Sequence, residues 1–421
     1  GASALLASLR AGATVMSELG RLESTPNEVM RDVCGDCDLA PRPVRFEQTN
    51  STVPFGDKLV IKVFRQLEPG LNAEIEVGSF LTAHAPRGVT PRVVGAVHYH
   101  RPGAEPTAVA VAHEFLPNQG TAWDLYENHL DTLFDRVLSG HLEAPPTPAE
   151  HLYDLVGREP PPEFIELAGA HLRHARRLGQ RIAEVHVLLA SGTDPGFAPE
   201  PFTQMHQQSL FQGVRTMLVR TAETLQRKRG SLPESVRGDV DLFLTSRSAI
   251  EARLREVSAR IIDTTRVRSH GDLHLGQVLW TGDDFVLIDF EGEPGRPLSD
   301  RRRKRSPLRD LAGMIQSFSY AVESDLYAGH QRPQDVTRLR PWARAWMAWT
   351  GAACLAGYLE TPGVRALIPA KPEDTRLLLD FYRLEKVVYE VNYELNNRPE
   401  WLPIPMRGLR DIVGVGGGAS P

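Results

Sequence analysis

The sequence has few cysteines, no long apolar run and no strong charge of either sign. Its 421 residues include three cysteines, which excludes a disulfide framework and agrees with a reducing compartment. No apolar run reaches the length of a membrane span, and the first residues lack a cleavable signal pattern. The formal net charge of −5 gives no reason to invoke nucleic acid. We therefore expect a soluble cytoplasmic protein without membrane or nucleic-acid partners.

Two of the cysteines, Cys34 and Cys37, have the C-x-x-C spacing of metal and redox sites. A structural zinc ion needs four ligands, and Cys354 is the remaining thiol. A redox pair would open a helix after a strand, whereas residues 26–33 look helical. We interpret Cys34 and Cys37 as incidental surface cysteines.

The segment from Ser269 to Glu291 carries the strongest chemical signal, and it reads SHGDLHLGQVLWTGDDFVLIDFE. Asp272 is followed by an amide, Gln277, at +5, and then by Asp289 at the end of an apolar strand-like run. Protein kinases place a catalytic Asp, an Asn and a metal-binding Asp in this order. The bland alternative is that both aspartates are ordinary turn residues.

Phosphoryl transfer explains why these residue types are needed together. The reaction requires an acceptor hydroxyl held in line and negative charge neutralised by Mg²⁺, which prefers oxygen ligands. We predict Asp272 as the base that meets the acceptor, and Gln277 with Asp289 as Mg²⁺ ligands. His270 or His274 would orient the loop by hydrogen bonding.

A nucleotide lobe is predicted upstream, although it lacks the G-x-G-x-x-G loop of many kinases. Residues 46–48 and 58–64 read as two strands around a polar loop, so Lys62 takes the position of the lysine that binds ATP phosphates. A helix over residues 72–81 carries two candidate partners for Lys62, Glu74 and Glu76. We favour Glu76 because Phe80 lies one turn further along the packing face, and Glu74 is the alternative. Backbone amides and the hydroxyls of Thr49, Ser51 and Thr52 would cover the phosphates.

Residues 108–117 read as a buried strand that ends in an extended, proline-terminated piece. Its backbone around Glu114 and Leu116 would suit the adenine edge of ATP. A plain sheet strand is the alternative.

Near the end of the chain, residues 384–397 form a helix with two different faces. One face is an apolar stripe, and the other carries Lys386, Tyr389, Glu390 and Tyr393. Tyrosine rings cover apolar sugar faces while polar groups pair sugar hydroxyls, so this face suits a sugar. Taken by itself, a solvated helix face explains it as well.

These motifs resemble the maltokinase family, which belongs to the aminoglycoside-phosphotransferase-like group with a protein-kinase-like fold. The resemblance rests on HGDLHLGQ, IDFEGEP and RPLSDRRRKRSPLRDLAGM, and extends from about residue 47 to 401. It implies ATP and Mg²⁺ as cofactors, maltose as the acceptor and maltose 1-phosphate as the product, feeding α-glucan synthesis. It also implies Asp272 as the base and Lys386, Tyr389 and Tyr393 as residues that line the sugar pocket. We predict Asp272, His274 and Glu390 as further sugar contacts.

The nucleotide lobe begins earlier than the family pattern requires. We therefore expect either a shortened N-terminal cap or the kinase part of a longer fusion with trehalose synthase. The predicted fold is α+β and bilobal, with a small strand-rich N-lobe and a large helical C-lobe. Its parts are a truncated cap or linker (1–45), a nucleotide-binding lobe (46–117), a helical lobe with catalytic loop and sugar pocket (118–411) and a flexible tail (412–421).

Other functions stay open at this point. A kinase of the same fold could act on another sugar, an aminoglycoside or choline, and a non-catalytic nucleotide-binding module would explain the missing glycine loop. The run of five basic residues at 301–305 is interpreted as a solvated loop, with the alternative that one arginine reaches sugar or phosphate oxygens. Asp310 is expected to brace the catalytic loop. Trp342, Trp346 and Trp349 read as core.

Overall fold

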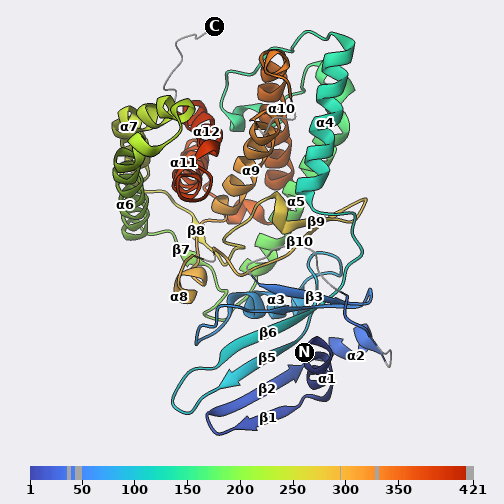
Figure 1. The fold of residues 1–421 in the computed structure, drawn as a ribbon. Helices are drawn as coiled ribbons and strands as arrows, with labels where there is room; N and C mark the ends of the chain where they lie inside the picture. The colour runs from blue at the N-terminus through green and yellow to red at the C-terminus, as the bar shows by residue number, and fades with distance from the viewer. Residues whose placement is uncertain (36–38, 43–49, 294, 328–330, 414–421) are drawn as a thin grey trace.

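The computed structural model describes residues 1–35, 39–42, 50–293, 295–327 and 331–413. It has two lobes, a small one built around a β-sheet and a large helical one (Figure 1). The predicted α+β bilobal architecture is confirmed. Within the described ranges, no helix is both long enough and apolar enough to cross a bilayer.

The small lobe is organised by a six-stranded antiparallel sheet with the order β1-β2-β5-β6-β4-β3. Helices α1 and α2 pack on one face, where their apolar side chains join those of Ile61 and Ala110; α3 packs on the other face, where Val111 lies. Alternate residues of a strand point to opposite faces, which is why neighbouring residues enter different cores. The bounds are Ala2–Ala11 (α1), Thr14–Ser17 (β1), Gly20–Pro26 (β2), Val29–Cys34 (α2), Ser51–Phe55 (β3), Leu59–Val63 (β4), Ala73–His84 (α3), Val93–His100 (β5) and Thr107–Glu114 (β6).

The first 35 residues do not form a separate cap. The first helix ends at Ala11, and β1 and β2 follow it. β2 pairs with β5 from Arg21 to Pro26, so this segment extends the sheet of the small lobe. Residue 45, the predicted boundary, lies outside the described residues. Residues 46–48, predicted as a strand, and residues 414–421 of the predicted tail lie outside the described residues.

The large lobe packs its helices around a single apolar core. The prediction that Trp342, Trp346 and Trp349 are core residues is confirmed. Cys34, predicted at the surface, is buried under the sheet instead, and Cys37 is outside the described residues. The helices are Ala122–Gly140 (α4), Pro162–Ala190 (α5), Gln204–Lys228 (α6), Glu234–Arg255 (α7), Leu298–Arg301 (α8), Leu308–Tyr327 (α9), Pro333–Glu360 (α10), Pro372–Asn397 (α11) and Pro403–Val413 (α12).

A two-stranded hairpin, β9 (Val278–Trp280) and β10 (Phe285–Leu287), lies between the helices and the small lobe (Figure 1). The chain leaving the sheet pairs with it, because Gln119 N donates to Trp280 O at 2.7 Å and Trp280 N donates to Gly120 O at 2.9 Å. All three residues of β10 are buried, as predicted for the strand that carries Asp289. The hairpin therefore holds the segment that carries Asp289 at the junction of the lobes.

Glycines allow α5 and α10 to approach closely. A Cβ added to Gly179 would lie 1.9 Å from the carbonyl oxygen of Cys354, and one added to Gly357 would lie 1.9 Å from that of Arg176. Neither backbone oxygen can move without displacing its helix. This contact fixes the scaffold beneath the hairpin.

We expect Gly179→Ala to lower the free energy of unfolding by about 3 kcal/mol or more, because overpacking against backbone forces the helices apart. The matched control is Gly238→Ala on α7, where an added Cβ meets nothing within 4 Å. That exchange should stabilise the protein by roughly 0.5–1 kcal/mol through helix propensity. Urea unfolding of both variants measures the two effects, and equal stabilities would contradict the packing argument.

Candidate active site

Lys62 reaches the junction of the lobes because of its register in the sheet. It pairs with Val111 of β6, and paired residues of neighbouring strands point to the same face. Val111 packs beside Ile75 of α3, so the Lys62 side chain emerges on the α3 side. The predicted second strand therefore delivers its lysine toward the predicted helix.

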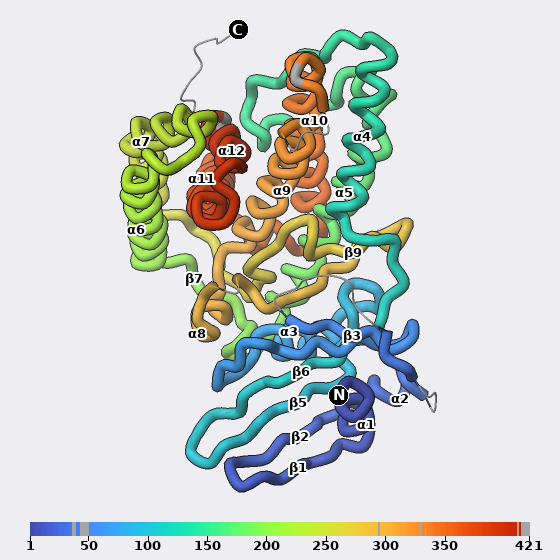
Figure 2. Tube along the Cα trace, viewed as in Figure 1, coloured from blue at the N-terminus to red at the C-terminus, as the bar shows by residue number. Residues whose placement is uncertain are grey.

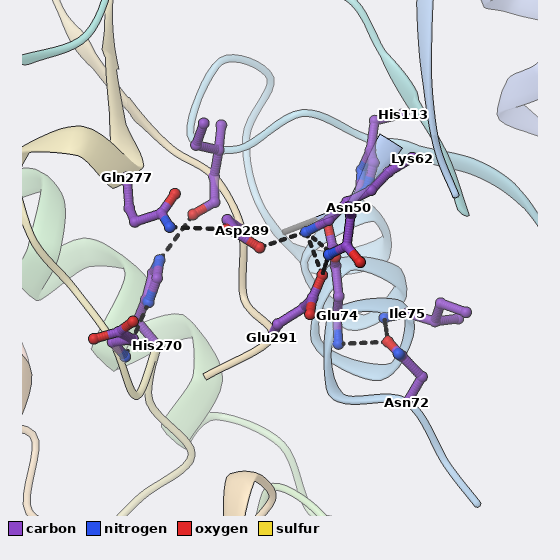
Figure 3. A network of polar contacts seen from close by, with 12 residues as sticks. Asn50, Lys62, Asn72, Glu74, Ile75, His113, His270, Gln277, Asp289 and Glu291 are labelled. Carbon is purple, nitrogen blue, oxygen red and sulfur yellow. Dashed lines mark hydrogen bonds and ion pairs between the residues drawn. The ribbon is translucent and has the colours of Figure 1, made fainter. Parts of the chain in front are cut away.

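The Lys62 ammonium lies among three carboxylates drawn from both lobes (Figure 3). Its Nζ is 2.8 Å from Glu74 Oε2 and 2.5 Å from Asp289 Oδ1, and it also pairs with Glu291. Burial alone would lower the pKa of Lys62, but these carboxylates outweigh it and raise the pKa above its usual value. The lysine is therefore cationic at any physiological pH.

The partner of Lys62 on α3 is Glu74, and the prediction that favoured Glu76 is wrong. Asn72 caps the helix by accepting from Glu74 N and Ile75 N, which places Glu74 in the first turn facing the sheet. Glu74 is 3% exposed and also contacts His113 Nε2 at 3.1 Å. The Lys62 and His113 contacts hold the pKa of Glu74 below its usual range despite the opposing effect of burial.

Glu76 points away from Lys62 toward the C-lobe. It accepts from Arg268 Nη2 at 2.7 Å and from Arg302 Nη2 at 2.8 Å. Residues two positions apart on an α-helix lie on opposite faces, so Glu74 and Glu76 cannot both face Lys62. Glu76 thus fastens α3 to the C-lobe rather than to the lysine.

Asp289 has a left-handed backbone with φ of 67°, which is uncommon for a residue other than glycine. Such conformations persist where the surroundings impose them, and they concentrate at functional sites. The side chain is held on both sides, since Oδ1 binds Lys62 and Oδ2 accepts from Gln277 Nε2 at 2.7 Å. The structure therefore brings together Lys62, Gln277 and Asp289, three of the predicted site residues (Figure 3).

Glu291 is a site residue that the sequence reasoning missed. It lies two positions after Asp289, within the DFE sequence, where protein kinases have glycine. It accepts from Asn50 Nδ2 at 2.7 Å, and burial together with the neighbouring carboxylates raises its pKa to about 7, against the opposing effect of Lys62. The sequence signal for Glu291 is an acidic residue at the position where the DFG motif of protein kinases has glycine.

The donor set fits a divalent cation. One carboxylate oxygen from each of Glu74, Asp289 and Glu291 lies within 4.8 Å of the others. Hard cations such as Mg²⁺ take carboxylate and amide oxygens, and the Gln277 carbonyl oxygen is not used in its bond to Asp289. Asp289 and Gln277 are therefore the residues that would hold the metal, with Glu291 in reach.

The loop that carries Asp272 is fixed by Asp310, as predicted. Asp310 accepts from the backbone N–H groups of His270 at 2.7 Å and Gly271 at 3.0 Å. It is itself held by His186 Nε2 at 3.0 Å, which in turn contacts the Tyr358 hydroxyl at 2.9 Å. The predicted orienting role of His270 is also met, because its Nε2 donates to Ile288 O at 2.8 Å.

Asp272 faces Lys386 of α11, with 3.4 Å between Oδ1 and Nζ. Burial opposes the charge on Lys386, but Asp272 and nearby glutamates raise its pKa above the usual value. His274 folds back to accept from Gly276 N, and burial lowers its pKa to about 4, so it is neutral near pH 7. A small cavity at Asp272 is also lined by Lys386, Tyr389, Glu293, Glu385, Arg296 and Arg309.

The predicted sugar face of α11 divides into two parts. Tyr389 and Tyr393 stack with centroids 6.4 Å apart, and Lys386 lies 5.2 Å from the Tyr389 centroid, so these three share a face. Glu390 does not: it is 8% exposed and accepts from Gln316 Nε2 of α9 at 3.0 Å. The structure thus places the predicted sugar ligand Glu390 in the packed interface between helices.

The remaining predicted nucleotide contacts are spread over two elements. Ser51 Oγ accepts from Arg65 Nε at 3.1 Å, and Thr52 lies directly opposite Lys62 on β3. Thr49 is outside the described residues. The Glu114 carboxylate binds Arg92 and its N–H donates to Arg92 O, whereas the Leu116 N–H has no acceptor among the described residues.

The basic run at 301–305 is not the solvated loop that was predicted. Lys304 is 6% exposed and binds Glu200 and two backbone carbonyls. Arg302 binds Glu76, and Arg301 binds Glu68 of the small lobe at 3.2 Å. The sequence could not show this burial, because the carboxylate partners come from distant segments.

Comparison with known proteins gives a consistent picture of the fold. No protein-family model matches the chain. The chain is 24% identical over 376 residues to a glucosamine kinase of Mycolicibacterium smegmatis, covering 89% of this chain and 80% of that protein. It is 24% identical over 409 residues to a glucosamine kinase of Streptacidiphilus jiangxiensis, covering 95% and 80%.

Solved structures agree. A glucosamine kinase in complex with glucosamine, ADP and inorganic phosphate superposes with a TM-score of 0.63 at 22% identity, covering 98% of this chain and 82% of that one. A second crystal form of glucosamine kinase gives 0.64 with the same identity and coverage. These likenesses show that the chain has the bilobal kinase-like fold of those proteins.

Buried Glu390 predicts a pH-dependent stability. Burial raises its pKa to about 7, above 4.5 in the unfolded chain, so the folded protein binds the extra proton and loses stability as pH rises between these values. Full ionisation of Glu390 lowers the free energy of unfolding by about 3 kcal/mol. Glu390→Gln keeps an acceptor for Gln316 but cannot ionise. We expect its stability to match that of the unmodified protein at pH 5 and exceed it at pH 8.

Urea unfolding across this pH range measures the difference between the two proteins. The difference isolates Glu390, because the buried His129 and His171, whose pKa values burial lowers, titrate in both. A difference that does not change with pH would contradict the assignment.

Proposed function

We propose that the protein is an ATP-dependent sugar kinase whose acceptor is glucosamine or a close relative. The observation that carries the proposal is the meeting of Lys62 from the N-lobe with Asp289 and Gln277 from the C-lobe hairpin. Phosphoryl transfer needs a lysine at the phosphates and oxygen ligands for Mg²⁺ at one point. The curated relatives, which are named glucosamine kinases, supply the acceptor.

Each group has a part in this proposal. Lys62 binds the α and β phosphates, and Glu74 holds it in place. The Leu116 N–H, which has no acceptor among the described residues, donates to the adenine edge. Mg²⁺, bound by Asp289 and Gln277, would neutralise charge on the phosphates. Glu76 takes no part in nucleotide binding.

Asp272 orients the acceptor hydroxyl and takes its proton as the phosphoryl group transfers. Lys386 holds the Asp272 carboxylate from the side, and Asp310 fixes the loop backbone, so the base is positioned before the sugar arrives. Tyr389 and Tyr393 would cover an apolar face of the sugar ring.

Maltose is the less well supported acceptor. The relatives reported above are named for glucosamine, so the alternative reading, a kinase for another sugar, fits better than maltokinase. The cavity at Asp272 has four carboxylates and three cationic groups, a nearly balanced lining that suits neutral sugars as well as amino sugars. The choice of glucosamine therefore rests on the relatives. A fused trehalose synthase has no support from them.

An acceptor comparison tests the proposal. ADP release is measured with ATP, Mg²⁺ and either glucosamine, glucose or maltose, and phosphorus NMR of each product identifies the oxygen that carries the phosphate. We expect the highest kcat/KM with glucosamine. A preference for maltose would restore the maltokinase interpretation. ATP binding without any sugar-dependent ADP release would identify a non-catalytic module.

Asp272→Asn tests the role of the base. We expect kcat to fall by roughly 10²-fold or more while the Kd of ATP changes little, because the exchange removes no predicted phosphate or metal ligand. Asp263→Asn, at an exposed aspartate upstream of the loop, is the matched control and should leave kcat unchanged. An Asp272→Asn enzyme with most of its activity would reject the assignment.

A further inference from the structure

The basic segment at residues 296–305 lines a cavity that the proposed mechanism leaves unused. The cavity has a volume of about 680 Å³ and is bounded by α6, α8 with the following loop, the chain before the catalytic loop, and one residue of α11. This volume lies within the range of small-molecule sites, about 300–1,000 Å³. Figure 2 shows α8 at the junction between the lobes, close to α3.

The lining is strongly cationic. Seven arginine and lysine side chains line the cavity, against three carboxylates, those of Glu200, Asp300 and Glu385. Glu76, which lies outside the lining, pairs with two of these arginines, Arg268 and Arg302, and contributes one negative charge. An excess of positive charge is left even after this contribution. A cavity with such an excess favours an anionic ligand.

Arg305 is the cation in this lining without a carboxylate partner. Its backbone N and O both bond to Val267, at 3.0 and 2.9 Å, so the residue is fixed in place. Among the described residues, no carboxylate lies within 4.0 Å of its guanidinium, whereas Arg303 and Lys304 beside it both have one. Burial and then repulsion from Arg309 lower the pKa of Arg305, against the opposing effect of the more distant Glu385, and a bound anion would relieve this unfavourable environment.

This cavity adjoins the acceptor pocket. Met217, Arg296 and Glu385 line both the large cavity and the small one that contains Asp272. A molecule in the large cavity would therefore lie one side chain away from the acceptor.

We propose that this cavity binds the phosphate group of a small phosphorylated molecule, with Arg305 as its main contact. A guanidinium fork matches phosphate oxygens in a bidentate geometry, and a phosphate dianion matches the uncompensated charge better than a single carboxylate does. The phosphate could belong to a phosphorylated sugar or be inorganic phosphate. The proposal concerns binding alone and is independent of the proposed turnover.

Isothermal titration calorimetry of the full chain tests the proposal. The nucleotide site is first filled with ADP and Mg²⁺, and the protein is titrated with inorganic phosphate in one arm and glucosamine 6-phosphate in the other. We expect Arg305→Gln to weaken binding by roughly tenfold or more, since it removes a charge-assisted contact. Arg220→Gln, at an exposed site on α6 outside the cavity, is the control and should bind as the unmodified protein does.

A second variant keeps the test independent of Arg305 and its effect on folding. Gly213 of α6 lines the cavity, and an added Cβ there meets nothing within 4 Å, so Gly213→Asp introduces a negative charge without a clash. It should weaken binding by a similar factor. Equal affinities with and without the sugar would identify inorganic phosphate as a sufficient ligand, and tighter binding of glucosamine 6-phosphate would identify a phosphorylated sugar. The proposal is overturned if neither probe binds, or if both variants bind as the unmodified protein does.

Discussion

One buried ammonium group, that of Lys62, joins the two lobes. It binds Glu74 from the small lobe and Asp289 and Glu291 from the large one. Removing one partner of a buried ion pair costs about 3–5 kcal/mol, because the remaining charge is left uncompensated. Three features bring these charged groups together. They are the sheet register that directs Lys62 toward α3, the cap at Asn72 that turns Glu74 inward, and the left-handed backbone at Asp289.

A buried carboxylate, that of Asp310, plays a similar role within the large lobe. Asp310 supplies two acceptors to the backbone of the catalytic loop, and the His186–Tyr358 pair behind it fixes its orientation. The loop is thus held by a side chain rather than by a sheet ladder. This network fixes the backbone of the loop that carries Asp272, and preorganisation of this kind lets an active site avoid reorganisation during a reaction.

The sequence predicted the parts of the site that are set by local spacing. The order of Asp272, Gln277 and Asp289, the strand that carries Lys62, and the bracing role of Asp310 follow from motifs within short segments. The errors share a different cause. The choice between Glu74 and Glu76 depended on which face of the helix meets the sheet. The strand β1 has no alternation of buried and exposed residues that would indicate a strand, because all four of its residues are exposed. The basic run looked solvated because its carboxylate partners lie far away in the chain. Glu390 belongs to the packed face only because α9 lies beside it.

The carboxylates around Lys62 have a consequence for how a nucleotide enters. Carboxylate oxygens of the protein surround the ammonium at positions that the phosphate oxygens of a nucleotide would need. Each of the three carboxylates has a second anchor: His113 for Glu74, Gln277 for Asp289 and Asn50 for Glu291. Under the proposed function, nucleotide binding would therefore be a ligand exchange, in which a phosphate replaces one of these carboxylates at the lysine. Glu291 lies two residues after Asp289, so its carboxylate would then be within reach of a cation held by Asp289 and Gln277.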